Sequence, residues 1–443
     1  MLFQYNLTKL VIILNWVLAL LPISFILGNL VINLHVLIFI TLGCIYLNKK
    51  KIKLNEKFPI LVFLFFCLFL IISSIYNQVN VEKSLLFLRI LIFYYISILL
   101  LKEKIFNLKI IFNIFSITVI IVCLDLIFQF FVGYNIIGLE VQNNGVTSFF
   151  GDEKIAGSYL QNFGFFLIYI IFEKFNKKNI KNEIIKSLLI ALISIAIFVS
   201  TQRMPMIIWL LFLIFYGAVF YKSKLKNILF SIFILGIFIN LFSSGNEKIN
   251  YTSFYKNIKN MINSTIIVYQ TNKDEKKLNE IKNFLIEQSL LPEKNLDFVK
   301  GSGHANLFGN GIYIWNNNKF LGIGYKNFYA KCAEYKLLRC STHPHNYYLE
   351  ILLTVGLLGF SIFIIYLIFL ILRSLQSLKI YWEKNQKEKF NLTLIFFINF
   401  LMIFFPFKSS GSFFTTFNIT YTIIILALLT SQIEKKYQAG RIV

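Results

Sequence analysis

Long apolar runs separated by short polar segments make up most of this chain. Twelve runs are apolar on every face, and many have the roughly 17–25 residues that a helix needs to cross a bilayer core. They lie at 10–27, 30–47, 58–76, 84–101, 110–132, 156–172, 187–201, 206–221, 227–243, 346–372, 392–407 and 418–432. Composition agrees, because the chain is 57% hydrophobic with a mean hydropathy of +0.69. The pattern predicts an all-α polytopic membrane protein with about twelve transmembrane helices.

One polar stretch is far longer than the others. It divides the chain into residues 1–243 with spans one to nine, the stretch 244–345, and residues 346–443 with spans ten to twelve. Within the stretch, residues 272–291 have apolar positions at helical spacing, with charged residues between them. Glycines that we interpret as turn signals follow, at Gly301, Gly303, Gly309 and Gly311. The sequence therefore predicts a large, mainly helical module between spans nine and ten.

Basic residues are concentrated in alternate loops. The short loops at 48–57, 102–109, 173–186, 222–226 and 373–391 hold lysine or arginine clusters, whereas the opposite short loops hold very few. The positive-inside rule then predicts that both termini face the cytoplasm and that residues 244–345 face the outer side. The net charge of +23 indicates contact with anionic membrane lipid. A nucleic-acid partner is not expected, because no soluble domain supplies a basic face.

A cluster of polar side chains lies where the long stretch meets span ten. The sequence reads His343-Pro344-His345-Asn346 and reaches Glu350 inside the span, although the chain has only four histidines. Polar groups at a membrane boundary are costly and therefore indicate a functional site. Alternatively, these residues cap span ten at the interface. A His-x-His metal site is a further reading, but no partner histidine stands at metal-ligand spacing.

Two arginines fall at or near the outer ends of spans. Arg203 stands in a tight outward turn between spans seven and eight, and Arg89 lies about six residues into span four. A guanidinium can bind a phosphate through two hydrogen bonds at once, so both are candidate substrate-binding residues. Arg203 could equally be an interfacial arginine that extends toward water. Arg89 could instead have a structural partner such as Glu82 or Asp125.

Acidic residues form a third candidate group. Asp152 and Glu153 stand just before span six, where they could bind a sugar or simply favour a helix N-terminus. Asp125 and Gln129 lie one turn apart inside span five, and we interpret this pair mainly as a contact between helices.

Cysteines fall into two groups. Cys44, Cys67 and Cys123 lie within predicted spans and are interpreted as small buried residues, whereas Cys332 and Cys340 both lie in the long stretch. An oxidising outer compartment permits a Cys332–Cys340 disulfide. Two free buried thiols are the alternative.

The junction resembles the signature of a known family. His345-Asn346 is followed, after nine residues, by Gly356 and then by Gly359, while Gly322-Ile323-Gly324-Tyr325-Lys326-Asn327-Phe328 precedes it as a Gly-x-Gly-x-x-x-Phe segment. Both motifs resemble those of the O-antigen ligase and O-antigen polymerase superfamily. The twelve predicted spans and the large late loop are similar to that family's topology.

The resemblance implies a glycosyltransferase that needs no metal and no cofactor. Its donor would be a glycan on undecaprenyl pyrophosphate, at the periplasmic face of the bacterial inner membrane. The acceptor would be lipid A–core for a ligase, a second lipid-linked repeat unit for a polymerase, or a protein for related members. We interpret the chain as an O-antigen ligase.

The resemblance also implies roles for individual residues. His345 would be the catalytic base, and Arg203, which matches a family arginine in such a turn, would bind the pyrophosphate. The family commonly has another arginine early in the large loop, where this chain has Gly301-Ser302-Gly303-His304. The full set of expected substrate-binding residues is Arg203, Arg89, His304, His343, Asn346, Arg339, Asp152 and Glu153.

A transporter or flippase is the main alternative from another functional class. Such a protein would have broken helices at matching positions of two halves, and no inverted repeat is visible in this sequence. The three-dimensional positions of Arg89, Arg203 and His345 distinguish the two: a shared outer site favours a transferase, and scattered positions favour transport.

Overall fold

The computed structural model describes residues 2–52, 57–141, 145–175, 179–219, 224–242, 265–274, 276–277, 279–280 and 303–433. The described part is 79% helical and has no β-strand, which confirms the all-α prediction. The first half contains α1 (Leu2–Ala19), α2 (Leu21–Leu27), α3 (Asn29–Lys50), α4 (Phe58–Tyr76), α5 (Val81–Leu86), α6 (Leu88–Lys102), α7 (Leu108–Val132), α8 (Ala156–Lys174), α9 (Ile180–Val199), α10 (Arg203–Val219) and α11 (Leu225–Phe242). The second half contains α14 (Gly303–Asn317), α15 (Phe328–Glu334), α16 (Tyr347–Glu383), α17 (Lys387–Ile403) and α18 (Thr416–Gln432).

The helices follow the apolar runs closely, with breaks in the first run, in span four and, at Gly356, in α16, and with one extension. The first run is a pair, α1 and α2, bent by 45°, where Pro22 cannot donate a helical hydrogen bond. Span four consists of α5 and α6, which are separated at Phe87. Helix α16 continues to Glu383, well past the predicted end of span ten at residue 372, so part of the predicted loop 373–391 is helical.

The number of membrane spans is only partly supported. In the described part, seven helices are long and apolar enough to cross a membrane, or eight if α1 and α2 together make one bent span. Helices α10 and α18 are apolar but shorter. The prediction of twelve spans therefore stays a prediction, as does the outward placement of residues 244–345.

Parts of the long stretch between α11 and α16 are helical. Residues 265–273 form a helix, and α14 and α15 follow, whereas most of the helix predicted for 272–291 lies outside the described residues. The interpretation of glycines as turn signals is wrong for Gly309 and Gly311, which lie inside α14. A Cβ atom on Gly309 would lie 2.6 Å from Val268, and one on Gly311 would lie 2.8 Å from Leu349. These glycines allow close helix packing. Gly301 lies outside the described residues.

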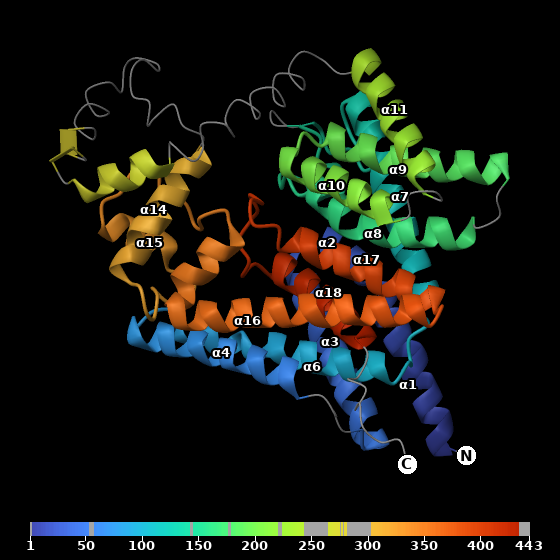
Figure 1. Ribbon diagram of the computed structural model, residues 1–443, viewed down its shortest axis with the longest axis horizontal. Helices are drawn as coiled ribbons and strands as arrows, with labels where there is room; N and C mark the ends of the chain where they lie inside the picture. Colours follow the sequence, from blue (N-terminus) through green and yellow to red (C-terminus); the bar gives the residue numbers. More distant parts are fainter. Residues whose placement is uncertain are drawn as a thin grey trace.

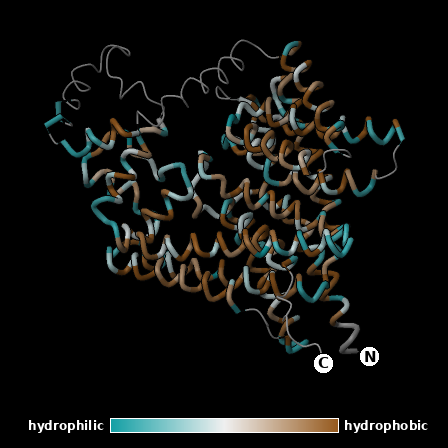
Figure 2. Tube along the Cα trace, in the orientation of Figure 1, coloured by the Kyte–Doolittle hydropathy of each residue, from teal (hydrophilic) through white to brown (hydrophobic). Residues whose placement is uncertain are grey.

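Figure 1 shows how the helices are grouped. Helix α4 packs along α16, and α6 packs against α18. Helices α7 to α11 form a second group, and α14 and α15 lie apart from it near one end of α16 and α4 (Figure 1). Apolar residues dominate the long helices, and polar residues gather at their ends and in the connections (Figure 2).

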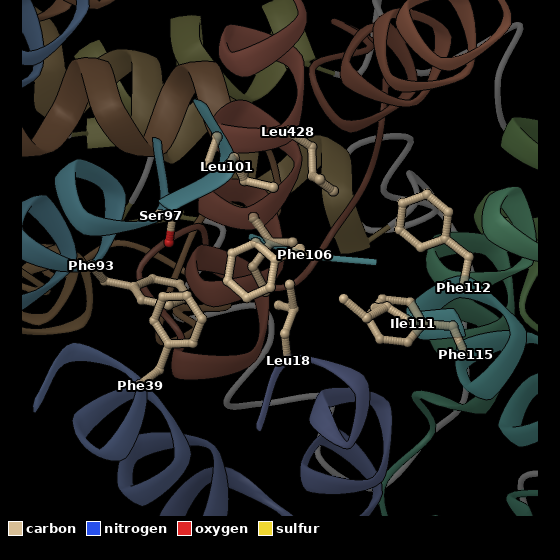
Figure 3. A pocket seen from close by; sticks show the side chains of 12 residues that line it. Leu18, Phe39, Phe93, Ser97, Leu101, Phe106, Ile111, Phe112, Phe115 and Leu428 are labelled. Atoms are coloured by element: carbon tan, nitrogen blue, oxygen red, sulfur yellow. The ribbon is translucent and has the colours of Figure 1, made fainter. Parts of the chain in front are cut away.

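Aromatic side chains fill much of the interior between the helices. Phe112, Phe115, Phe163 and Phe166 are buried and pack edge to face or tilted against one another. A small apolar pocket between α1, α3, α6, α7 and α18 is also lined mainly by phenylalanine and leucine, and Ser97 is its polar member (Figure 3). None of the candidate site residues lines this pocket.

Candidate active site

The break in α16 gives the junction its shape. Gly356 has a positive φ of 66° and interrupts the helix, which leaves backbone groups on both sides without helical partners. The loop before α15 supplies these partners. The N–H of Ile323 donates to the carbonyl of Leu353 at 2.7 Å, and the N–H of Leu357 donates to the carbonyl of Lys319 at 2.8 Å. The loop therefore packs into the helix break.

Glycines are required on both sides of this contact. A Cβ atom on Gly356 would overlap the carbonyl group of Phe320, and one on Gly322 would overlap the carbonyl oxygen of Leu353. Gly322 and Gly324 also have positive φ angles, of 74° and 87°, which side chains disfavour. Gly322 and Gly356, one from each sequence motif, thus serve one backbone-to-backbone contact.

The C-terminal end of α4 holds the same loop from the other side. Ser73 Oγ donates to the carbonyl of Thr354 at 2.7 Å, and Asn77 Nδ2 donates to that of Gly322 at 3.1 Å. Ser74 Oγ accepts a hydrogen bond from the N–H of Tyr325 at 3.0 Å. These bonds fix the position of Lys326, the next residue, beside the site.

His345 is held by the loop between α17 and α18. Its Nδ1 atom lies 3.2 Å from the carbonyl oxygen of Ser410, and its own carbonyl accepts from the N–H of Ser410 at 2.9 Å. Since a carbonyl only accepts, Nδ1 must carry the hydrogen, and Nε2 of the neutral ring keeps its lone pair. His345 also has a φ of 57°, an uncommon backbone conformation outside glycine.

The same loop, residues 404–415, binds the start of α16 at two more points. Asn346 caps the helix by accepting from the N–H of Leu349 at 3.1 Å, and its Nδ2 donates to the carbonyl of Pro406 at 2.8 Å. The buried carboxylate of Glu350 accepts from Ser412 Oγ at 2.5 Å and from the N–H of Phe413 at 2.6 Å. The contribution of residues 404–415 to the site was not predicted from the sequence. The small polar run Ser409-Ser410-Gly411-Ser412 between two spans was the available signal.

Three histidines meet at this point. The ring centroid of His345 lies 4.1 Å from that of His343 and 5.0 Å from that of His304, which stands in the first turn of α14. Burial and the neighbouring His345 lower the pKa of both His304 and His343 to about 4. Burial also lowers the pKa of His345, although the Ser410 carbonyl partly offsets this effect. Near pH 7 all three rings are therefore neutral.

Positive charges surround the histidines. Arg203, the first residue of α10, is half-buried and close enough to His304 for its charge to contribute to the lowered pKa of that ring. Arg89 is exposed, and its charge affects the pKa of both Tyr325 and Lys326. Partial burial is the main reason that the pKa of Lys326 is lowered. Two arginines and a lysine from three segments therefore lie around the loop and the histidines.

Residues 188–364 match the family model described as O-antigen ligase. We call residues 188–364 the O-antigen ligase domain, after the family that they match. It includes Arg203, the three clustered histidines and the Gly356 break, and it begins after Arg89. No curated protein matches the chain.

Asp152 and Glu153 precede the O-antigen ligase domain, whereas Arg339 lies within it. Asp152 and Glu153 are exposed in the connection before α8, and Arg339 is exposed after α15. In the described part, neither Glu153 nor Arg339 contacts the three histidines. Gln202 Oε1 accepts from the N–H of Ser158 at 2.7 Å and so ties the start of α8 to the turn that carries Arg203.

Asp125 has a different role from the one expected. Its carboxylate accepts from the N–H of Ile136 at 2.9 Å and from Ser148 Oγ at 2.5 Å. Gln129 binds the same connection by accepting from the N–H of Ser148 at 2.7 Å. The pair therefore organises the segment after α7 instead of joining helices. Within the described residues, neither Asp125 nor Glu82 forms an ion pair with Arg89.

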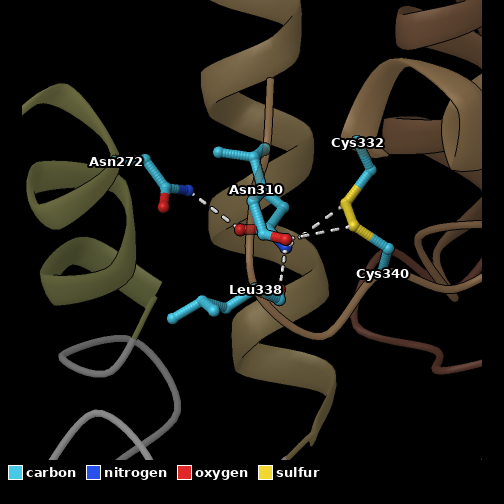
Figure 4. The surroundings of a disulfide bond; sticks show 6 residues. Asn272, Asn310, Cys332, Leu338 and Cys340 are labelled. Atoms are coloured by element: carbon cyan, nitrogen blue, oxygen red, sulfur yellow. Dashed lines mark hydrogen bonds between the residues drawn. A yellow bond between two sulfur atoms is a disulfide. The ribbon is translucent and has the colours of Figure 1, made fainter. Parts of the chain in front are cut away.

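The segment that precedes His343 in the O-antigen ligase domain contains a disulfide. Cys332 and Cys340 are bonded, with their Cα atoms 5.8 Å apart. Asn310 of α14 donates to the carbonyl of Leu338 at 2.7 Å inside the loop that the disulfide closes, and it accepts from Asn272 at 2.9 Å (Figure 4). The loop that leads to His343 is thereby tied to α14. In the described part, no group of three or more His, Cys, Asp or Glu side chains is arranged to hold a metal ion.

Proposed function

We propose that this chain is an inverting, metal-independent glycosyltransferase that moves a glycan from undecaprenyl pyrophosphate to lipid A–core. The reaction would take place at the periplasmic face of the bacterial inner membrane. One observation carries the proposal. His345 belongs to the O-antigen ligase domain, is neutral near pH 7, and has its Nδ1 bound to Ser410, so that Nε2 is available to accept a proton.

The proposed step has one proton transfer and one displacement. Nε2 of His345 takes the proton of the acceptor hydroxyl while the acceptor oxygen attacks the anomeric carbon of the donor. The bond from that carbon to the pyrophosphate oxygen breaks, and the pyrophosphate leaves with the electron pair. Attack from the side opposite the leaving group inverts the anomeric configuration.

The leaving pyrophosphate requires compensation of its charge. Arg203 is our candidate for this role, because it lies close to the histidines and a guanidinium can bind two phosphate oxygens. Arg89 and Lys326 are candidates for the second contact, since the loop at Tyr325 brings their charges near each other. Lys326 is not in the set expected from the sequence, and we propose it because its pKa responds to Arg89.

The remaining residues are proposed to position the base or to contact sugars. His304 and His343 pack against the His345 ring, and Asn346 and Glu350 hold residues 404–415, which carry Ser410. The amide of Asn346 is already engaged with backbone groups, so we assign it to positioning. Asp152, Glu153 and Arg339 are retained as candidate contacts for the glycans, which extend beyond the reacting sugars.

The acceptor is tested by deleting the gene and separating the lipopolysaccharide by gel electrophoresis. A ligase deletion removes all capped core, whereas a polymerase deletion leaves core capped with a single repeat unit. Unchanged lipopolysaccharide together with a missing glycoprotein would identify a protein acceptor and reject the ligase proposal. Plasmid-borne protein should restore the pattern, and the His345→Ala variant should not.

Transport is less well supported than transfer. Arg203, Arg89 and His345 come from distant parts of the sequence. Arg203 and His345 both lie near His304 of α14, and Arg89 lies near Tyr325 in the loop before α15. A shared site of this kind favours chemistry at one face. If the protein moved intact lipid-linked glycan across vesicles without transferring it, the transferase proposal would be wrong.

A further inference from the structure

Two hollows lie at the end of α16 and α17 that is remote from His345. Helix α16 begins beside His345 and runs away from it, and α17 returns toward residues 404–415. The first hollow, of about 500 Å³, is lined in part by Lys224 and Lys387, and the second, of about 400 Å³, is a groove along α17. Trp382 and Phe390 line both, so the hollows are adjacent.

The first hollow carries positive charge. Lys224 is buried where α11 begins, donates to Tyr216 Oη at 2.6 Å and lies 4.9 Å from the centre of the Phe172 ring. Lys387, the first residue of α17, is exposed. No acidic side chain is among the described residues that line this hollow. Burial lowers the pKa of Lys224 to about 7, and the charge of Glu173 partly offsets this. A bound anion would further favour the ammonium form.

The second hollow is an apolar groove. Apart from Lys379, the described residues that line it are apolar, and they come from α10, α16 and α17. Along α17 the lining extends from Phe390 to Leu401, which corresponds to about 17 Å at 1.5 Å per residue. That length and chemistry fit a fatty acyl chain. A free phosphate ion would leave this groove empty.

We propose that the two hollows together bind one anionic glycerophospholipid of the surrounding membrane. Its phosphate lies between Lys224 and Lys387, and one acyl chain lies in the groove along α17. Trp382 is 72% exposed at the boundary between the two parts, as is common for tryptophan at the level of lipid headgroups. This binding site is separate from the proposed transfer reaction and does not depend on it.

Trp382 also provides the reporter for the test. The protein is reconstituted into bilayers of mixed neutral and anionic lipid, in which either species carries brominated chains that quench indole fluorescence. The signal of Trp382 is the difference between the unaltered protein and the Trp382→Phe variant. We expect brominated anionic lipid to quench this signal several times more strongly than the same mole fraction of brominated neutral lipid.

Lysine variants show whether the preference comes from the first hollow. Lys387→Gln removes an exposed charge and should lower the preference on the order of fivefold, the contribution of one basic residue near an anionic surface. Lys389→Gln is the matched control, because Lys389 is exposed on the same helix and lines neither hollow. Equal quenching by both lipids, or an equal effect of the two variants, would overturn the proposal.

Discussion

The Nδ1 atom of His345 and the carbonyl oxygen of Ser410 lie 3.2 Å apart across 65 residues of sequence. This bond joins the end of the long polar stretch to the connection between the last two helices. It fixes both the tautomer and the orientation of the ring. The proposed base is therefore oriented by a backbone carbonyl, which would be present whatever residue replaced Ser410.

Loss of the imidazole should remove most of the activity. General-base assistance is typically worth about 10²–10⁴-fold in rate, so we expect His345→Ala and His345→Gln to lower transfer by that range. Transfer from a lipid-linked donor is measured with purified protein, and thermal unfolding in detergent checks the fold. His343→Ala should lower the rate less, because His343 is assigned to positioning.

The same assay distinguishes a base from a metal ligand. EDTA should leave the rate of the unaltered protein unchanged. If EDTA stopped transfer and an added divalent metal restored it, the three clustered histidines would have to be reassigned as ligands. Normal activity of His345→Ala at normal expression would contradict the base assignment directly.

Transfer should depend on pH through the ionisation of His345. A base must be unprotonated, and burial lowers the pKa of His345 below its ordinary value of 6.5. The value of kcat/KM should therefore be constant near pH 7 and fall only as the pH drops below about 6.5. Unfolding must be followed in parallel, because the lowered pKa of His304 and His343 also reduces stability as the pH falls from 6.5 toward 4. An acid limb centred above pH 7 would contradict this prediction.

Arg203 should be replaceable by lysine only in part. Arg203→Ala should lose most of the transfer activity, and Arg203→Lys should recover a fraction, since an ammonium cannot bind two phosphate oxygens in the same planar geometry. Arg373→Ala is a suitable control, because it removes the same charge from a similarly half-buried position near the far end of α16. Arg89→Ala and Lys326→Ala, measured alongside, would show which side chain supplies the second contact. Full activity of Arg203→Ala would exclude Arg203 as the residue that binds the pyrophosphate.

The disulfide should stabilise the segment that contains α14 and α15 without taking part in the chemistry. We expect Cys340 to resist a membrane-impermeant maleimide until the protein is reduced. The double variant Cys332→Ser, Cys340→Ser should lose about 2–4 kcal/mol of stability but keep measurable transfer at low temperature. Labelling of intact cells also tests the predicted outward placement of residues 244–345. Ready labelling without reduction would mean that the bridge is absent.

The helices could be predicted from the sequence because their signal is local. A run of apolar residues needs no partner to be recognised, and each predicted run coincides with a helix or a broken helix. His345 is predicted to belong to a site for a related reason, since a polar cluster beside an apolar run stands out. The end of α16 was harder to predict, because its last turns are polar and extend beyond the apolar run.

The supports of the site could not be predicted because they are contacts between distant segments. Ser410, Ser412 and Phe413 act largely through backbone groups, which every residue possesses. Asp125 was expected to join helices, yet it binds a connection only 11 and 23 residues away. Hydrogen bonds of this kind depend on how the chain folds back on itself and leave little trace in composition.

The contact between Gly356 and Gly322 can be tested with three alanine substitutions of graded severity. Gly356→Ala combines a positive φ with overlap of the Phe320 carbonyl. Gly133→Ala has a positive φ of 90° but no atom within 4 Å of the added Cβ, and Gly236→Ala meets neither obstacle. Gly236→Ala should be neutral or stabilising, and Gly133→Ala should cost about 1–2 kcal/mol. Gly356→Ala should cost more than either, because backbone atoms must move.

Activity should follow a different order from stability among these variants. Gly133 lies away from the loop before α15, so Gly133→Ala should keep its transfer rate once the folded fraction is taken into account. Gly356→Ala should displace that loop, which carries Tyr325 and Lys326, and should therefore lower the rate per folded molecule. Thermal unfolding and the transfer assay on the same samples separate the two effects. If Gly356→Ala were no worse than Gly133→Ala in both measurements, Gly356 would not be needed for packing of the loop into the break of α16.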